Sequence, residues 1–344
     1  MALFFAMHAT PVPGAFLDAG VQAPPLGIGL AAIGRPGYIN LRRGAEFDQL
    51  GERSLDAMER RCHEVLDAAY ASGVRYFDCA RSYGEAERFM GTWLASRGLA
   101  GRADLLVGSK WGYKFTAGWR VDTRGAPHEV KDHSLAHLRE QSAESARLLG
   151  GHLSLYQIHS ATLESGVLDD GAVLDELRAI RAARGWRIGL SVSGPRQADV
   201  IRKALALEPP LFDCVQATYN LLEQSAAPAL DEARAAGVVV IVKEAMANGR
   251  LLQPGRPAAD AVREVAARLD VPADALCLAV VMRQGFAPMV LSGAATAEQA
   301  RSNARALELA ADARLDDATV GALVGSCRMD PAEYWAERGR LEWN

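Results

Sequence analysis

The sequence has few cysteines, no long apolar run and no excess of charge, and each absence excludes a class of protein. Its five cysteines are far apart and form no CxxC pair: Cys62, Cys79, Cys214, Cys277 and Cys327. This spacing argues against a disulfide framework and a zinc site, and it indicates a reducing compartment. The apolar N-terminus is short and lacks a basic region, so we expect no signal peptide. No run has transmembrane length, and we therefore expect a cytoplasmic protein that does not enter a membrane.

Charge and glycine patterns exclude two further classes. The 38 basic and 42 acidic residues nearly cancel, giving a formal net charge of −4, and the arginines are dispersed. The sequence therefore predicts neither a nucleic-acid groove nor contact with an anionic membrane. No GxGxxG motif follows the first apolar segment, which counts against a Rossmann dinucleotide site.

Short apolar runs alternate with helical segments along the 344 residues. We expect strands over residues 26–30, 74–78, 105–110, 153–158, 187–191, 214–217, 238–242 and 289–291. We expect helices over residues 54–71, 85–98, 134–149, 172–184, 195–207, 225–236, 259–269, 273–284 and 296–310. Longer irregular loops occupy residues 31–53 and 111–132, and the tail from Leu315 adds one short helix.

This alternation predicts a single parallel (β/α)8 TIM barrel domain, with a doubly wound sheet as the alternative. The barrel occupies about residues 25–310. Residues 311–344 form a C-terminal extension that either covers part of the barrel or packs against a neighbouring chain. In such a barrel the strand bodies fill the core, and the carboxyl ends of the strands carry the chemistry.

Polar residues end three consecutive predicted strands. Asp78 ends the second strand, Lys110 the third and His159 follows the fourth, while Tyr83 lies just beyond Asp78. Taken singly, each could be a capping or salt-bridged structural residue. Because the carboxyl ends of neighbouring barrel strands share one rim, we expect all four side chains to converge on a site.

The four residue types suit proton transfer to a carbonyl oxygen. A phenol has an ordinary pKa of about 10, and a neighbouring ammonium group such as that of Lys110 lowers it. Asp78 would keep Lys110 charged and oriented, and His159 would donate a hydrogen bond to the oxygen that Tyr83 protonates. No side chain can donate hydride, so this chemistry requires a nicotinamide cofactor.

A set of motifs over roughly residues 25–310 resembles the aldo-keto reductase superfamily in order and spacing. The motifs are Phe77-Asp78…Ser82-Tyr83-Gly84, Ser109-Lys110-Trp111-Gly112, Gln157-Ile158-His159-Ser160, Ile188-Gly189-Leu190-Ser191, Val215-Gln216 and Ser292-Gly293-Ala294…Gln299…Asn303. The resemblance implies that Asp78, Tyr83, Lys110 and His159 form a catalytic tetrad in which Tyr83 is the general acid.

The same resemblance implies an extended NADP or NAD molecule across the barrel mouth. Ser191 and Gln216 would meet its carboxamide, and the backbone from Glu244 to Gly249 would pass near its pyrophosphate. The residues implied at the adenosine end are Gly293, Gln299 and Asn303.

Three departures from the family pattern bear on this cofactor. Val192 stands where the family usually has Asn, which removes one carboxamide hydrogen bond. Lys243 stands where an aromatic residue commonly stacks on the nicotinamide, so we expect Lys243 to turn away or to pair with Glu244. Ala295 and Gln299 stand where many relatives carry basic residues that bind the 2′-phosphate of NADP, so NAD is an option beside NADP. Arg301 and Arg305 lie nearby in the sequence but are shifted in register.

We expect an NAD(P)-dependent oxidoreductase that interconverts a small aldehyde, ketone or sugar-like carbonyl compound and its alcohol. The alternative is a non-catalytic nucleotide-binding protein that resembles the β-subunit of a potassium channel. A metal-dependent barrel hydrolase is disfavoured because the seven histidines show no ligand spacing, so we expect no metal.

The predicted substrate wall comes from the two long loops and from the turn after the fourth strand. Its expected members are Trp111, Tyr113, Phe115, Trp119 and Ser160. The arginines of residues 35–53 could favour an anionic substrate, but loop arginines are more often solvated.

Overall fold

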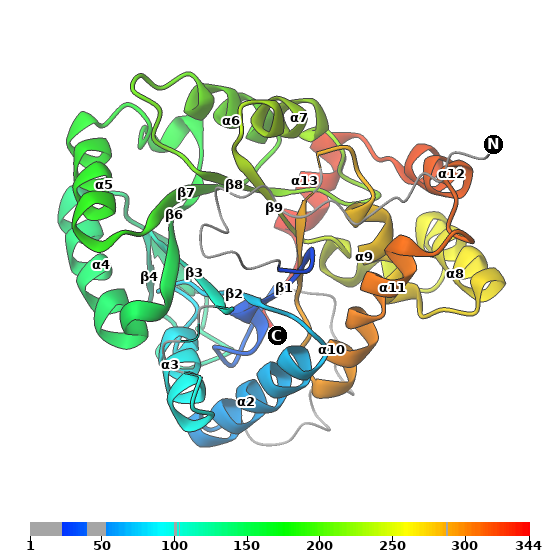
Figure 1. Ribbon diagram of the computed structural model, residues 1–344, viewed down its shortest axis with the longest axis horizontal. Helices are drawn as coiled ribbons and strands as arrows, with labels where there is room; N and C mark the ends of the chain where they lie inside the picture. The colour runs from blue at the N-terminus through cyan, green and yellow to red at the C-terminus, as the bar shows by residue number, and fades with distance from the viewer. Residues whose placement is uncertain (1–22, 40–52, 100–101, 103, 287) are drawn as a thin grey trace, which may run out of the picture.

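Eight parallel strands close into a barrel in a computed structural model of the chain, which describes residues 23–39, 53–99, 102, 104–286 and 288–344 (Figure 1). The barrel strands are β1 (Leu26–Gly29), β2 (Tyr76–Asp78), β3 (Leu106–Trp111), β6 (Leu153–Ala161), β7 (Arg187–Val192), β8 (Cys214–Thr218), β9 (Val239–Lys243) and β10 (Met289–Ser292). Each strand pairs with the barrel strand next to it in the chain, and β10 pairs with β1 to close the ring. The predicted (β/α)8 barrel is confirmed.

The barrel strands are apolar on both sides because each side meets a different part of the core. In β9, Val239 and Ile241 belong to a small buried cluster with side chains of the other barrel strands, whereas Val240 and Val242 belong to the larger core. Successive strand residues point to opposite faces, so the four β-branched residues serve both clusters. This double burial explains why the strands read as continuous apolar runs.

Helices surround the barrel on the outside (Figure 1). They are α2 (Leu55–Ala71), α3 (Ala86–Ser96), α4 (Leu135–Leu149), α5 (Gly171–Arg184), α6 (Gln197–Leu205), α7 (Ala227–Ala235), α8 (Pro257–Leu269), α9 (Ala273–Met282), α10 (Ala297–Ala304) and α11 (Ala306–Ala311). Ser54 begins α2 as a cap whose hydroxyl accepts a hydrogen bond from Ala57 N, and Asp170 caps α5 in the same way. Short 3-10 turns occur at Leu30–Ala32, Gly150–His152, Leu163–Ser165 and Ala247–Leu252.

Three local predictions were wrong. The loop expected over residues 111–132 contains an antiparallel hairpin of β4 (Tyr113–Phe115) and β5 (Glu129–Lys131), whose strands are too short to show a periodic pattern. The helix expected over residues 296–310 is divided into α10 and α11 at Arg305. The tail has two helices, α12 (Asp317–Cys327) and α13 (Pro331–Gly339), instead of one.

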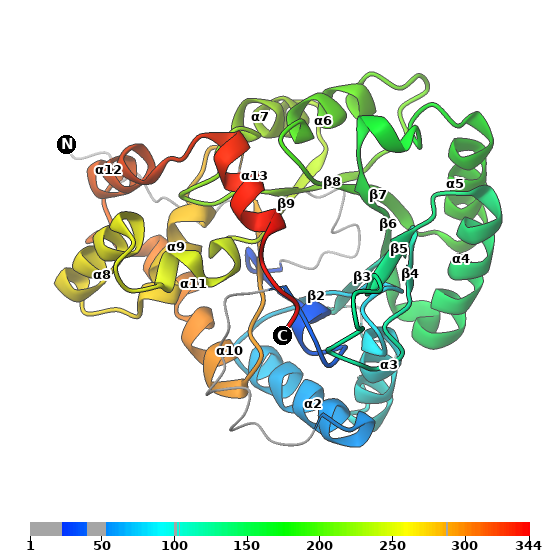
Figure 2. The same ribbon diagram turned by 180° about the vertical axis from the view of Figure 1, so that it is seen from behind.

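The C-terminal extension crosses the barrel, an alternative that the sequence left open. Figure 2 shows α13 and the last residues passing in front of the strands. Beyond α13, Trp343 forms a β-bridge with Ile39, and Tyr38 and Asn344 exchange two backbone hydrogen bonds of 3.2 Å. The last residues are therefore tied to the loop that follows β1. Residues 40–52 of that predicted loop lie outside the described part of the chain.

Two findings bear on the classes considered above. All five cysteines are buried and free. Within the described ranges, no helix combines the length and the apolar character needed to span a bilayer.

Candidate active site

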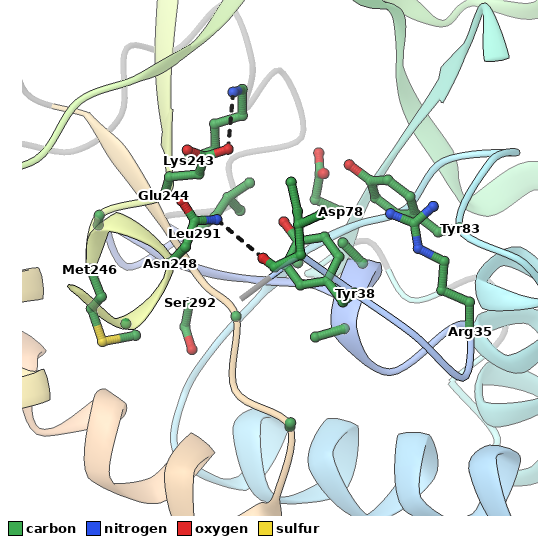
Figure 3. A pocket seen from close by; sticks show the side chains of 18 of the residues that line it. Arg35, Tyr38, Asp78, Tyr83, Lys243, Glu244, Met246, Asn248, Leu291 and Ser292 are labelled. Atoms are coloured by element: carbon green, nitrogen blue, oxygen red, sulfur yellow. Dashed lines mark hydrogen bonds and ion pairs between the residues drawn. The ribbon is translucent and has the colours of Figure 1, made fainter. Parts of the chain in front are cut away.

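A pocket lies at the carboxyl ends of the barrel strands (Figure 3). Strand register brings the ends of β2, β3 and β6 side by side, because Asp78 lies opposite Gly108 and Lys110 opposite Gln157. Further lining comes from β5 and β8, from the loops after β1, β9 and β10, and from the C-terminal segment. The described residues that line it include Arg35, Tyr38, Asp78, Tyr83, Glu129, His159, Ser160, Gln216, Lys243, Glu244, Gly249, Gly293, Ala295, Arg338 and Trp343.

Asp78 and Lys110 form a buried ion pair at the base of this pocket. The side chains are 2% and 0% exposed, and Lys110 Nζ donates to Asp78 Oδ1 and, over 3.0 Å, to Cys79 O. The other carboxylate oxygen, Asp78 Oδ2, accepts hydrogen bonds from Tyr76 at 2.9 Å, from Gln216 at 3.0 Å and from Gln157 at 3.3 Å. A buried charge needs partners of this kind, so the position of the Lys110 ammonium group is strongly fixed.

Tyr83 and His159 complete the group of four predicted residues. The Tyr83 hydroxyl lies 3.4 Å from His159 Nε2, and the two rings meet edge to face with centroids 5.4 Å apart. Lys110 Nζ lies 5.0 Å from the centre of the Tyr83 ring. On the other ring nitrogen, His159 Nδ1 lies 3.4 Å from the Ser82 hydroxyl, and this contact helps to orient the imidazole. The structure therefore brings these four residues together, and we call Asp78, Tyr83, Lys110 and His159 the acid wall.

Burial sets the protonation of the acid wall. It raises the pKa of the Tyr83 phenol well above 10, the Asp78 carboxylate adds to the rise, and Arg35 opposes it. Burial also lowers the pKa of His159 well below its usual value, with help from Lys110 and Arg35. At neutral pH both groups are uncharged. The expected lowering of the Tyr83 pKa is not found, because burial of the phenol and the Asp78 carboxylate together raise it.

A second charged group lines the pocket at the end of β9, and we call Lys243, Glu244 and Arg338 the ionic wall. Arg338 from α13 donates from Nε and Nη2 to the two oxygens of the Glu244 carboxylate, at 2.6–3.0 Å. Lys243 Nζ lies 3.7 Å from Glu244 Oε1 and donates to Thr218 Oγ1 over 2.7 Å. The predicted pairing of Lys243 with Glu244 is thus present (Figure 3).

The ionic wall has two shifted pKa values. Burial alone would raise the pKa of Glu244, but Arg338 and Lys243 outweigh it and lower the pKa to about 2. Burial lowers the pKa of Lys243 to about 8, although Glu244 opposes the change. Glu244 is also held in the left-handed backbone region with φ of 59°, which is uncommon for a residue other than glycine.

The predicted cofactor residues fall into two sets. Those that line the pocket are Gln216, Lys243, Glu244, Gly249 and Gly293. The rest are engaged behind its surface and do not line it: Ser191 Oγ accepts from Ser160 N over 2.8 Å, Gln299 Oε1 accepts from Ala295 N over 2.9 Å, and the Asn303 amide bonds Ser292 and Asp274.

The predicted substrate residues also divide. Ser160 lines the pocket, and Tyr113 packs edge to face on His159 with centroids 5.0 Å apart. Trp111 is fully buried beneath the hairpin against His133, and it does not reach the pocket surface. Trp119 packs on Phe89 and donates to Arg53 O over 2.9 Å, also outside the lining. Neither tryptophan belongs to the described lining of the pocket, so their place in the substrate wall stays a prediction.

Sequence reasoning missed several pocket residues that lie far apart in the chain. For the arginines of residues 35–53 the sequence left open a place facing the substrate or a solvated one, and Arg35 is 3% exposed and lines the pocket. Arg338 carried no prediction. The other missed members are Tyr38, Glu129 and Trp343. In the sequence, each of these residues is simply a charged or aromatic residue in a loop or in the tail. Such a residue alone does not show which distant residue it contacts. Within the described residues, no group of three or more His, Cys, Asp or Glu side chains is placed to hold a metal.

Several features of the pocket fit a dinucleotide. The loops after the seventh and eighth barrel strands, β9 and β10, both line it, and these loops bind phosphate groups in many TIM barrels. Gly293 has open space where a side chain would stand, and the lining also includes Gly29, Ala31, Ala32 and Ala295. The Gln216 amide could meet a carboxamide. The Glu244 carboxylate also lines the pocket, and its charge is compensated by Lys243 and Arg338.

Comparisons with known proteins agree with this geometry. A model of the aldo/keto reductase family matches residues 48–319. The chain is 28% identical over 193 residues to aldo-keto reductase str7 of Strobilurus tenacellus, a match that covers 55% of this chain and only about half, 51%, of that protein. It is 27% identical over 259 residues to a D-threo-aldose 1-dehydrogenase of a Pseudomonas species, covering 70% of this chain and 71% of that protein.

A solved structure shares the fold. The aldo-keto reductase AKR11C1 from Bacillus halodurans, in its holo form, superposes with a TM-score of 0.59 at 19% identity, over 94% of this chain and 93% of that one. At this identity the likeness concerns the arrangement of strands and helices alone.

Proposed function

The chain belongs to the aldo/keto reductase family, and on that premise we propose that it is an NAD(P)-dependent oxidoreductase that interconverts an aldehyde, ketone or sugar-like carbonyl compound and its alcohol. The observation that carries the proposal is the acid wall. A neutral phenol lies 3.4 Å from a neutral imidazole, above a buried Asp–Lys pair, and all four groups face or support one pocket.

Tyr83 is the proton donor of this proposal. Its raised pKa keeps the phenol protonated at neutral pH, as a general acid requires. In carbonyl reduction its hydroxyl proton passes to the substrate oxygen, and in alcohol oxidation the phenolate takes that proton back. Bound nicotinamide supplies or accepts the hydride. The positive charge of Lys110, fixed by Asp78, stabilises the phenolate that remains after proton transfer.

His159 orients the substrate oxygen. Because burial keeps its imidazole neutral, Nε2 can donate a hydrogen bond without a competing proton transfer. That nitrogen lies beside the Tyr83 hydroxyl, so one oxygen atom can contact both groups. The arrangement is that of a preorganised site, in which donors already face the position where charge develops.

The cofactor would be held by β8 and by the loops that follow β9 and β10. Gln216 would bind the carboxamide, the loop of residues 244–249 would lie along the pyrophosphate, and Gly293 would leave room for the adenosine half. Arg301, the arginine of α10, pairs with Glu298 on the surface at 3.2 Å. These contacts support use of NAD as well as NADP, because a 2′-phosphate needs cationic partners for strong binding.

The experiment is a turnover assay with a panel of aldehydes, ketones and aldoses in the presence of NADH or NADPH. The similarity to an aldose dehydrogenase is the reason to include aldoses, with NAD and NADP for the reverse direction. We expect oxidation of reduced nicotinamide with at least one carbonyl substrate. Nucleotide binding without turnover on any of them would contradict the proposal and favour a non-catalytic nucleotide-binding protein.

A further inference from the structure

Arg35 is a buried arginine beside the proton donor, and nothing in the tetrad assigns it a role. It follows the 3-10 turn after β1, lines the pocket and is 3% exposed. Figure 3 shows its guanidinium group against the ring of Tyr83. The guanidinium carbon lies 5.0 Å from the centre of that ring, within the range of a cation–π contact. Burying an arginine is costly unless its charge and donors are matched, so this position needs an explanation.

The contacts of Arg35 connect it to the backbone of the donor. Its Nη1 donates to Ser82 O over 2.9 Å and to Glu129 Oε2 over 2.8 Å. Ser82 O belongs to the peptide group that joins Ser82 to Tyr83. The same guanidinium carbon lies 4.5 Å from the ring of Trp343 and 5.6 Å from the ring of Tyr38. The guanidinium is thus enclosed by three rings and fixed by a carboxylate and a carbonyl.

The loop that carries Arg35 docks closely on the Tyr83 turn. Glu85 N donates to Gly34 O over 2.8 Å. A Cβ at Gly34 would lie 2.5 Å from Tyr83 O, and a Cβ at Gly84 would lie 2.6 Å from Gly34 O. Gly84 also has a φ of 60°, a conformation that favours glycine. Two glycines therefore allow the backbones to touch, and this contact fixes where Arg35 can place its head group.

Several charges face the Tyr83 phenol from the elements around it. Asp78 and Lys110 come from β2 and β3, Glu129 from β5 and Glu244 from the end of β9, while His159 from β6 is neutral. The three carboxylates raise the pKa of the phenol, and Arg35 lowers it. Arg35 and Lys110 each lie 5.0 Å from the centre of the Tyr83 ring, and each is paired with a carboxylate, that of Glu129 for Arg35 and that of Asp78 for Lys110.

We propose that Arg35 is a positioning residue of the acid wall, which holds the Ser82–Tyr83 peptide in place and keeps a positive charge against the donor ring. The proposal rests on the proposed function, because it takes Tyr83 to be the proton donor. Its mechanical half, the placement of the ring, can be tested without any turnover.

The first test is NMR of protein labelled with carbon-13 at the tyrosine ring carbon that bears oxygen, with Tyr83→Phe identifying the Tyr83 resonance. Arg35→Met should shift and broaden that resonance, and Arg35→Lys should shift it less because a cation remains. Arg75→Met is the matched control, since Arg75 also lies over a tyrosine ring, Tyr70 at 4.2 Å, but outside the pocket lining. It should leave the Tyr83 resonance unchanged. An unaltered Tyr83 resonance in folded Arg35→Met would overturn the proposal whether or not the enzyme turns over.

The second test is the pH dependence of alcohol oxidation with the best substrate of the panel. Loss of the Arg35 charge should move the apparent pKa of the base upward by about one unit, which means about tenfold slower oxidation below that pKa. Arg35→Lys should restore most of the pH profile but not the full kcat, because an ammonium group cannot reproduce the fork geometry. A uniform loss of kcat in both variants with the wild-type pH profile would overturn the claim that Arg35 keeps a positive charge against the donor ring. If wild-type protein shows no turnover, the proposed function fails while the NMR result still decides the placement of the ring.

Discussion

Each of the two charged walls of the pocket contains a buried carboxylate, and the two walls compensate its charge in different ways. In the acid wall, the buried Asp78–Lys110 pair comes from adjacent strands, and three neutral donors of the barrel interior complete it. In the ionic wall, Glu244 at the end of β9 is compensated by Arg338 of α13, which lies 94 positions further along the chain. The acid wall is therefore a property of the barrel, whereas the ionic wall exists only when the C-terminal extension is in place.

Because of this difference, a mutation in one wall should affect different properties of the protein from a mutation in the other. A pair built from adjacent strands has the rigidity of the barrel, which suits a proton donor that must keep its distance to a reacting atom. A pair that joins a strand end to a terminal helix depends on the docking of that helix. The acid wall should therefore determine catalysis, and the ionic wall should determine stability and the shape of the cofactor side.

The largest effect should follow a change in the acid wall itself. Tyr83→Phe removes only a hydroxyl group, so turnover on any active substrate should fall by about two to four orders of magnitude. Nucleotide binding should remain near the wild-type value, because the ring stays in place. Steady-state kinetics and a nucleotide titration of the same preparation check both points. Turnover within a few-fold of wild type would exclude Tyr83 as the donor.

Lys110→Met should change both the stability of the protein and the proton transfer by the acid wall, and the two effects can be measured separately. It leaves Asp78 charged, buried and without its cation, which should lower the free energy of unfolding by about 3 kcal/mol. We expect the lower end of the usual range because Tyr76, Gln157 and Gln216 still donate to the carboxylate. The apparent pKa of the acid group should also rise, or activity should be lost.

Denaturant unfolding and a pH–rate profile measure the two consequences of Lys110→Met. The matched control is Lys114→Met, since Lys114 forms an exposed pair with Asp132 at 3.4 Å. That change should cost less than about 1 kcal/mol. An unchanged pH profile in an active Lys110→Met enzyme would mean that Lys110 and Tyr83 do not interact, and Asp78→Asn should give a milder form of the same defect.

The ionic wall should make stability sensitive to acid. The folded-state pKa of Glu244 is depressed from 4.5 to about 2, so its stabilising contribution is present above pH 4.5 and is lost as the pH falls toward 2. In Arg338→Met the folded-state pKa should return toward its ordinary value. The variant should be less stable at neutral pH, and its loss of stability between pH 5 and 2.5 should be smaller than that of wild type by about 2 kcal/mol.

Unfolding midpoints at both pH values test this window. Arg202→Met removes a similarly forked but exposed arginine–glutamate pair with Glu232, and it should behave like wild type. Equal acid sensitivity in wild type and Arg338→Met would contradict the assigned role of the pair.

The smallest effect concerns cofactor choice. Gln299→Arg places a cation at the start of α10, where Gln299 now accepts a bond from Ala295 N. It should tighten NADPH relative to NADH by about one or two decades, the worth of one or two charge-assisted hydrogen bonds. Nucleotide titrations measure the ratio, and Arg301→Gln serves as the control because Arg301 pairs with Glu298 on the surface. Loss of NADPH affinity in Arg301→Gln would reveal a cationic contact that this account lacks.

The two walls also differ in how much of them the sequence could predict. Asp78, Lys110 and His159 stand at the ends of apolar runs, so their convergence follows from the barrel pattern alone. Arg338 has no such signal, because its partner is Glu244 and only the docked extension brings the two together. The buried position of Arg35 depends in the same way on contacts among distant segments, including Glu129 and Trp343.

The fold itself was predicted closely where segments were long and periodic. The errors concern short strands such as Tyr113–Phe115, whose three residues carry no measurable period, and the break at Arg305, a good helix former that gives no sequence signal for a helix end. The direction of the Tyr83 pKa shift was missed for a physical reason as well. The sequence shows which charges are near, but it does not show how completely a phenol is removed from water.

One measurement tests the central claim, that this pocket binds a nicotinamide dinucleotide beside an acid wall. Wild-type protein should be titrated with NADH and with NADPH in parallel, with cofactor fluorescence as the signal. We predict saturable binding of both nucleotides, with affinities that differ by less than about a hundredfold. Absence of binding to either nucleotide would contradict the assignment of the pocket, and NADPH binding more than about a hundredfold tighter would contradict the account of its adenosine end.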